Sequence, residues 1–165
     1  MMEEMLQKLM KDVKGMEISI PFPRLTWEEA MNRYGRDKPD NRFAMELQDI
    51  TELFINCGFK VFQDCIANAG SIKAVVVPDK ASMTRKEIDK ITELAKKNGA
   101  KGLVTLKYLN GEVSGPIVKF LSEDEIHALI ERLTLKENDL VLIVSDKWRI
   151  TCEVLGALRN HFGSL

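Results

Sequence analysis

The strongest constraint in this sequence is a helix with both ends marked, in residues 82–104. Thr84 and Glu87 have the spacing of a capping box, in which each side chain accepts a hydrogen bond from the other residue's backbone N–H. The apolar residues that follow share one helical face: Ile88, Ile91, Leu94 and Ala95. Asn98-Gly99 is typical of a helix C-terminus. These signals predict a helix whose apolar face covers a sheet.

Strand-like runs lie on both sides of this helix. Residues 102–109 alternate with the period of a strand, and the turn Asn110-Gly111 directs the chain back toward the IVKFL run of residues 117–121. Upstream, residues 59–67 and 71–78 give two more strand-like runs. Ser122 and Glu125 form a second capping-box pattern that opens another amphipathic helix. The predicted fold class is therefore α+β: a two-layer β-β-α-β-β-α unit, with an antiparallel sheet covered by two helices.

Helices are also predicted outside this unit. Apolar residues recur at helical spacing from Met2 to Val13, and Thr26 with Glu29 forms a third capping-box pattern before the helix of residues 27–34. Residues 140–146 are typical of a buried strand, and residues 148–162 of a final helix. We expect the first and last helices to bury their apolar stripes on each other or on another copy of the chain.

A charged segment with a proline connects the second helix to the unit. We interpret this segment as a hinge, because Pro39 disfavours helix at Lys38. The hinge residues are Arg36, Asp37, Lys38, Pro39 and Asp40. Two aspartates beside a proline are more typical of turn capping than of a metal site, so we expect no metal here.

Composition excludes several classes of protein. The 165 residues are 45% hydrophobic and 30% charged, with no apolar run as long as a membrane span. The N-terminal segment lacks the basic and apolar regions of a secretory signal, so we expect a cytoplasmic protein without membrane contact. The candidates for catalysis show no spacing that links them, and we expect none of them to be catalytic: Cys57, Cys65, Cys152, His127 and His161.

Positive charge is concentrated in the middle of the chain. Residues 59–120 carry eleven basic and six acidic side chains, whereas both flanks are acidic overall. The candidate RNA-facing residues are Lys86, Lys90, Lys97 and Lys101. The alternative is a solvated helix face, which the Glu93–Lys97 spacing and the lack of interleaved aromatic residues favour.

Specific residues give a family resemblance. The hinge region carries Leu25-Thr26, Glu29-Ala30, Arg33-Tyr34-Gly35, Asp37-Lys38-Pro39-Asp40 and Arg42-Phe43. It resembles the segment of bacterial-type aspartyl-tRNA synthetases that follows class II motif 2. The downstream chain resembles their GAD insertion domain through Arg85-Lys86-Glu87-Ile88-Asp89, Gly99-Ala100-Lys101-Gly102-Leu103, Lys119-Phe120-Leu121-Ser122 and Leu155-Gly156-Ala157-Leu158-Arg159. Arg36 departs from the serine usual in that family, so the hydrogen bonding of its turn is not carried over.

This resemblance implies an excised piece of a larger enzyme. Residues 1–58 would be a flanking segment of the class II catalytic domain with the hinge, residues 59–146 the GAD insertion domain, and residues 147–165 a return helix. The chain lacks the FRxE core of motif 2 and the arginine of motif 3, so the resemblance implies no cofactor in this fragment and no activity alone. The intact parent, a homodimer, would ligate aspartate to tRNA(Asp) with ATP and Mg²⁺.

Two alternatives remain beside the synthetase. One is the GAD domain of a Glu-tRNA amidotransferase subunit, and the other is an unrelated binding module. The run EAMNRYGRDKPDNRF in residues 29–43 favours the synthetase, because an amidotransferase GAD domain is not expected to carry it.

Overall fold

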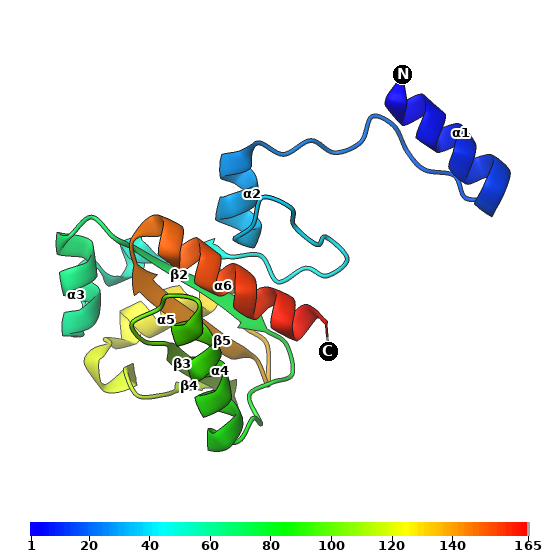
Figure 1. The fold of residues 1–165 in the computed structure, drawn as a ribbon. Helices are drawn as coiled ribbons and strands as arrows, with labels where there is room; N and C mark the ends of the chain where they lie inside the picture. Colours follow the sequence, from blue (N-terminus) through cyan, green and yellow to red (C-terminus); the bar gives the residue numbers. More distant parts are fainter. Residues whose placement is uncertain (165) are drawn as a thin grey trace.

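The computed structural model describes residues 1–164 and has a five-stranded antiparallel sheet at its centre (Figure 1). The strands lie in the order β1-β2-β5-β3-β4. Their bounds are Gln48–Asp49 for β1, Ser71–Val77 for β2, Val104–Leu109 for β3, Glu112–Ser114 for β4 and Leu140–Asp146 for β5. The last strand in sequence is the middle of the sheet, pairing Leu142 with Val75 and Val141 with Leu106. The sheet therefore depends on residues far apart in the chain.

Helices cover both faces of the sheet. Their bounds are Met2–Lys14 for α1, Trp27–Tyr34 for α2, Lys60–Ala67 for α3, Arg85–Lys97 for α4, Glu123–Leu133 for α5 and Trp148–Gly163 for α6, with 3-10 turns at Thr51–Phe54 (η1) and Val118–Phe120 (η2). One apolar core lies between the sheet and α4 with α6, and the other between the sheet and α3, α5 and η1. Along β5, Leu142 belongs to the first core and Val141 to the second.

The α+β class and the antiparallel sheet are confirmed, whereas the two-layer arrangement is wrong. The predicted covering helices α4 and α5 lie on opposite faces of the sheet, because β5 has buried apolar side chains on both sides. A strand of this kind needs helices above and below it.

The marked ends of α4 form as the sequence predicts. Thr84 N–H donates to Glu87 Oε2 at 2.7 Å, and Thr84 Oγ1 accepts from Glu87 N–H at 3.4 Å. Ile91 and Ala95 are buried, and Gly99 follows the helix with a φ of +105°. At α5 only half of the box forms: Ser122 Oγ accepts from Glu125 N–H, while the Glu125 carboxylate accepts from the serine hydroxyl.

Two predicted strands are wrong. Residues 59–67 lie in α3, where Phe62 is fully buried and Phe59 and Ile66, three and four residues away, pack beside it. This run contains aromatic and β-branched residues that suggest a strand, but its core contacts follow the helical period. The turn at Asn110-Gly111 is confirmed, with φ of +54° and +75°. Its returning strand is β4, and the IVKFL run contains η2 instead.

The expected pairing of the first and last helices within one chain is also wrong. Val154, Leu155 and Leu158 of α6 are fully buried in the core between α6 and the sheet. Helix α1 has no buried residue and projects from the rest of the molecule at the end of a long linker (Figure 1). Burial of the α1 stripe on another copy stays a prediction.

Helix α2 crosses α6 at very close range. A Cβ atom on Gly156 would lie 2.6 Å from the backbone oxygen of Gly35, and a Cβ on Gly35 would also collide with the α6 backbone. Gly35 ends α2 with a φ of +70°, a conformation that favours glycine. The crossing thus requires glycine in both helices.

We predict that Gly156→Ala destabilises the chain by about 2–3 kcal/mol, because the two backbones must separate to admit a methyl group. Alanine's better helix propensity, about 1 kcal/mol, only partly offsets this cost. Gly102→Ala is the matched control, since no atom lies within 4 Å of its added Cβ. Urea unfolding measures both variants, and a G156A variant as stable as G102A would contradict the close crossing.

Candidate functional site

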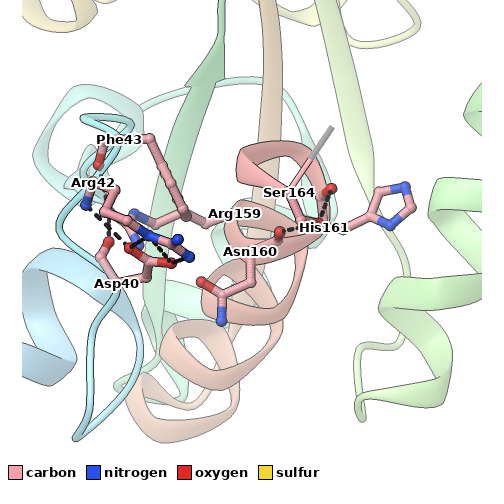
Figure 2. A network of polar contacts seen from close by, with 7 residues as sticks. All are labelled: Asp40, Arg42, Phe43, Arg159, Asn160, His161 and Ser164. Carbon is pink, nitrogen blue, oxygen red and sulfur yellow. Dashed lines mark hydrogen bonds and ion pairs between the residues drawn. The ribbon is translucent and has the colours of Figure 1, made fainter.

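Arg159 of α6 is the largest fully buried side chain and holds the loop that follows α2. Its Nε donates to the Met45 carbonyl at 3.0 Å. Its Nη2 lies 2.9, 2.8 and 3.1 Å from the carbonyl oxygens of Asp40, Phe43 and Ala44. We call this arrangement, one guanidinium and four loop carbonyls, the Arg159 clamp. Figure 2 shows Arg159 beside two of these residues, Asp40 and Phe43. The clamp ties the loop after α2 to α6.

Two aromatic rings complete the surroundings of the guanidinium. Its Cζ lies 4.3 Å from the ring centroid of Phe43 and 4.8 Å from that of Tyr34, within the range of cation–π attraction. Burial lowers the pKa of Arg159, and the negative charges of Asp40 and Glu46 oppose that effect. Carbonyl oxygens and rings, rather than a bonded carboxylate, therefore stabilise this buried cation.

The carboxylates of the same loop have other partners. Asp40 accepts from Arg42 through both the side chain and the backbone N–H, and these bonds lower its pKa to about 2. Glu46 accepts from Arg33 Nη2 at 2.7 Å, which lowers the pKa of Glu46. With its amide oriented to suit its neighbours, Asn160 accepts from Arg36 Nε at 3.0 Å. Arg36 thus adds a contact between the hinge and α6.

Asn32 forms a second link between α2 and α6. Its Oδ1 accepts from Lys73 Nζ at 2.9 Å and from Trp148 Nε1 at 2.8 Å. Lys73 is almost fully buried on β2, and the Asp49 carboxylate lies 4.0 Å from its ammonium. One side chain of α2 therefore contacts both the sheet and the start of α6.

The predicted hinge residues lie around this site. Arg36, Asp37 and Lys38 are exposed, and Pro39 and Asp40 are half-buried. The carbonyl of Asp40 belongs to the clamp. Their role as a hinge stays a prediction.

The structure brings together only part of the predicted lysine set. Lys86, Lys90 and Lys97 are exposed on α4. Lys90 and Lys97 line a cavity of about 670 Å³ between α4 and the end of α6. His161 lines the same cavity and points away from Arg159, toward α4 (Figure 2). Lys101 lines a different cavity.

The side chains considered for catalysis are spread over the fold. Burial raises the pKa of Cys57, Cys65 and Cys152, which disfavours their reactive thiolates. His127 and His161 are exposed on different helices. Within residues 1–164, no group of three or more histidine, cysteine or acidic side chains is suited to a metal ion. The same residues include no helix with the length and apolarity needed to cross a bilayer.

Sequence reasoning missed Arg159 and Asn32 as structural centres. A signal for Arg159 was present, because it lies between Leu155 and Phe162 on the apolar face of α6. An arginine on such a face must find buried acceptors or reach solvent. Asn32 carries no comparable signal, since it is an ordinary polar residue of a short helix.

Comparison with known proteins defines the class. The family model described as the GAD domain matches residues 62–155, from α3 into α6, so the chain belongs to the GAD domain family. It is 49% identical over 164 residues to an aspartate–tRNA(Asp/Asn) ligase of Bacillus cytotoxicus, and 52% identical over 160 residues to an aspartate–tRNA ligase of Streptococcus agalactiae. These alignments cover 99% and 96% of this chain, but 28% and 27% of the two relatives. The chain therefore spans just over a quarter of their length.

We predict that the Asp40 carboxyl titrates with a midpoint of about 2, against 3.8 for an ordinary aspartate. Because this pKa is lowered by folding, the stabilisation from Asp40 is present above the unfolded value and lost as pH falls through the folded one. Arg42→Gln removes the side-chain partner and should raise the midpoint by about one unit. A pH titration followed by carbon NMR of the Asp40 carboxyl group measures this midpoint.

Arg24→Gln, on the exposed linker before α2, provides the control and should leave the Asp40 midpoint unchanged. A midpoint near 3.8 in the unchanged chain would contradict the bonding of this loop.

Proposed function

We propose that this chain is the GAD insertion module of an aspartate–tRNA ligase, together with flanking stretches of that enzyme's catalytic domain, and that it is not catalytic by itself. The observation that carries the proposal is sequence identity of about 50% to two ligases along 96–99% of the chain. That similarity extends through the hinge and past the GAD match, into the return helix. An amidotransferase GAD domain or an unrelated module does not account for similarity to ligases at both ends.

In the parent enzyme, the module would be held at a fixed orientation relative to the catalytic domain. The Arg159 clamp and the Asn32 contacts hold the incoming segment and the return helix side by side. Two adjacent connections restrict rotation far more than one flexible linker does. A change in backbone conformation at the predicted hinge residues would then move the whole module as one rigid unit.

The rest of the synthetase is the proposed partner of α1. This helix exposes a methionine-rich apolar stripe, with Met5 60%, Leu9 52% and Val13 69% exposed. An unpartnered stripe of this kind is typical of a protein interface. The matched relatives extend well beyond the matched segment and therefore contain the chain that would cover it. A homodimeric parent in the cytoplasm is part of the same proposal.

Aspartate activation belongs to the parent in this account. Adenylate formation needs cationic groups, and usually Mg²⁺, arranged around the triphosphate. The class II motifs that supply those arginines are missing from the sequence. We infer that the fragment binds neither ATP nor Mg²⁺ as a cofactor.

Contact with tRNA(Asp) is proposed for α4. Lys90 and Lys97 beside His161 place positive charge along one exposed groove, with Lys86 one turn before Lys90. Such groups suit phosphate oxygens. Three acidic residues, Glu87, Asp89 and Glu93, line the same groove and support the alternative of a solvated face. Lys101, at a separate cavity, would contact a different part of the RNA.

A graft tests the function. The segment of the Bacillus cytotoxicus ligase that aligns with this chain is replaced by residues 1–164, and charging of tRNA with aspartate is measured. We expect activity within about tenfold of the parent enzyme, because clamp and core are retained together. The isolated chain should show no aspartate-dependent pyrophosphate exchange. A folded but inactive graft, or exchange by the isolated chain, would contradict the proposal.

The same graft tests the lysines. Lys90→Gln with Lys97→Gln should raise KM for tRNA by about threefold to tenfold and reduce its salt dependence, since two phosphate contacts are lost. Pyrophosphate exchange should not change. The control is Lys60→Gln with Lys119→Gln, two basic residues outside the groove. Equal KM values in the two double variants would favour the solvated face.

A further inference from the structure

A cavity of about 560 Å³ lies where α3 ends and α6 begins, separate from the α4 groove. It is bounded by the end of α3, the loop after α4 and the end of β5. The polar side chains that line it are Asp64, Cys65, Asn68, Lys101, Ser145, Asp146 and Lys147. Of these side chains, only Lys101 has a role above, as a proposed RNA contact.

Opposite charges line this cavity without neutralising one another. Asp64 and Asp146 contribute carboxylates, and Lys101 and Lys147 contribute ammonium groups. Among residues 1–164, none of the four takes part in an ion pair within 4.0 Å. Asp146 and Lys101 both act on the Cys65 thiol, whose pKa is raised mainly by burial, further raised by Asp146 and lowered by Lys101. A negative and a positive side chain therefore both lie close enough to Cys65 to act on its thiol.

Asp146 is the best-defined group of the cavity. Its side chain is 9% exposed, and Oδ1 accepts from the Lys147 N–H at 2.7 Å. Its Oδ2 is buried and has no hydrogen-bond partner within the described residues. A buried carboxylate oxygen without a donor is costly and calls for an explanation. The bond at the start of α6 explains Oδ1 only, so Oδ2 is left without a donor.

We propose that this cavity binds a small zwitterion that carries a primary ammonium and a carboxylate, the chemistry of a free α-amino acid. The ammonium donates to Asp146 and Asp64, and the carboxylate accepts from Lys101 and Lys147. A ligand with only a positive charge leaves both lysines without an oppositely charged partner. A ligand with only a negative charge leaves both aspartates without one. A ligand with both charges compensates all four groups. The cavity volume lies within the range of small-molecule sites.

Amide NMR of the full chain, titrated with glycine and L-alanine, tests this inference. Both amino acids should shift the amide signals of Gly70, Lys101 and Lys147 saturably, with Kd on the order of 1 mM. Methylammonium and acetate, each with half of the chemistry, serve as matched ligands and should bind at least tenfold more weakly. Absence of saturable shifts at these amides, or equal binding of methylammonium or acetate, overturns the proposal.

Variants distinguish the site from general surface binding. Asp64→Asn and Lys101→Gln alter exposed side chains and should each weaken glycine binding by about tenfold while the remaining spectrum is unchanged. Lys86→Gln makes the same charge change on α4, outside the cavity, and should bind as the unchanged chain does. Equal affinity in all three variants overturns the proposal. The inference is independent of the proposed function, because the graft can succeed whether or not the cavity binds a ligand.

Discussion

A buried guanidinium is the interaction that holds the loop after α2 against α6. Moving a cation out of water is costly unless its donors find acceptors. Arg159 Nε and Nη2 find them in four carbonyl groups of one irregular loop, whereas the buried Nη1 has no hydrogen-bond partner within the described residues. The loop benefits as well, because a segment without regular secondary structure needs hydrogen-bond donors for its backbone carbonyl oxygens. Loop and helix therefore stabilise each other.

The position of this clamp in the chain has consequences for the whole fold. Strand β5 lies at the centre of the sheet, and α6 follows it directly and covers one face. Arg159 is on that helix, beyond residues 62–155 of the GAD match. Sheet, covering helix and clamp are consequently one continuous structure. The clamp thereby connects α6, in which the GAD match ends, to the loop of residues 40–45.

Local signals predicted much of the fold, and tertiary contacts decided the rest. The α4 caps, the Asn110-Gly111 turn and the β5 strand are encoded by neighbouring residues and were predictable. Residues 59–67 were misread because Phe59 and Phe62 suit a strand by type, whereas their spacing suits α3. The two-layer model failed because a continuous apolar strand shows that both faces are buried without showing which helix covers which face.

The site was less predictable than the fold. The exposed lysines of α4 could be found from charge alone, but their separation from Lys101 required the structure. The clamp joins residues more than a hundred positions apart, and its acceptors are backbone atoms, which carry no side-chain signature. Only the position of Arg159 on an apolar helix face pointed toward it.

The most direct test of this account replaces Arg159 by lysine, which keeps the charge but cannot reach four carbonyls with a planar group. Arg149→Lys, on the exposed start of the same helix, is the control. Amide hydrogen exchange should accelerate across residues 40–47 in Arg159→Lys alone, with a loss of about 2–4 kcal/mol in the free energy of unfolding. Unchanged exchange in that loop would contradict the central role of the clamp.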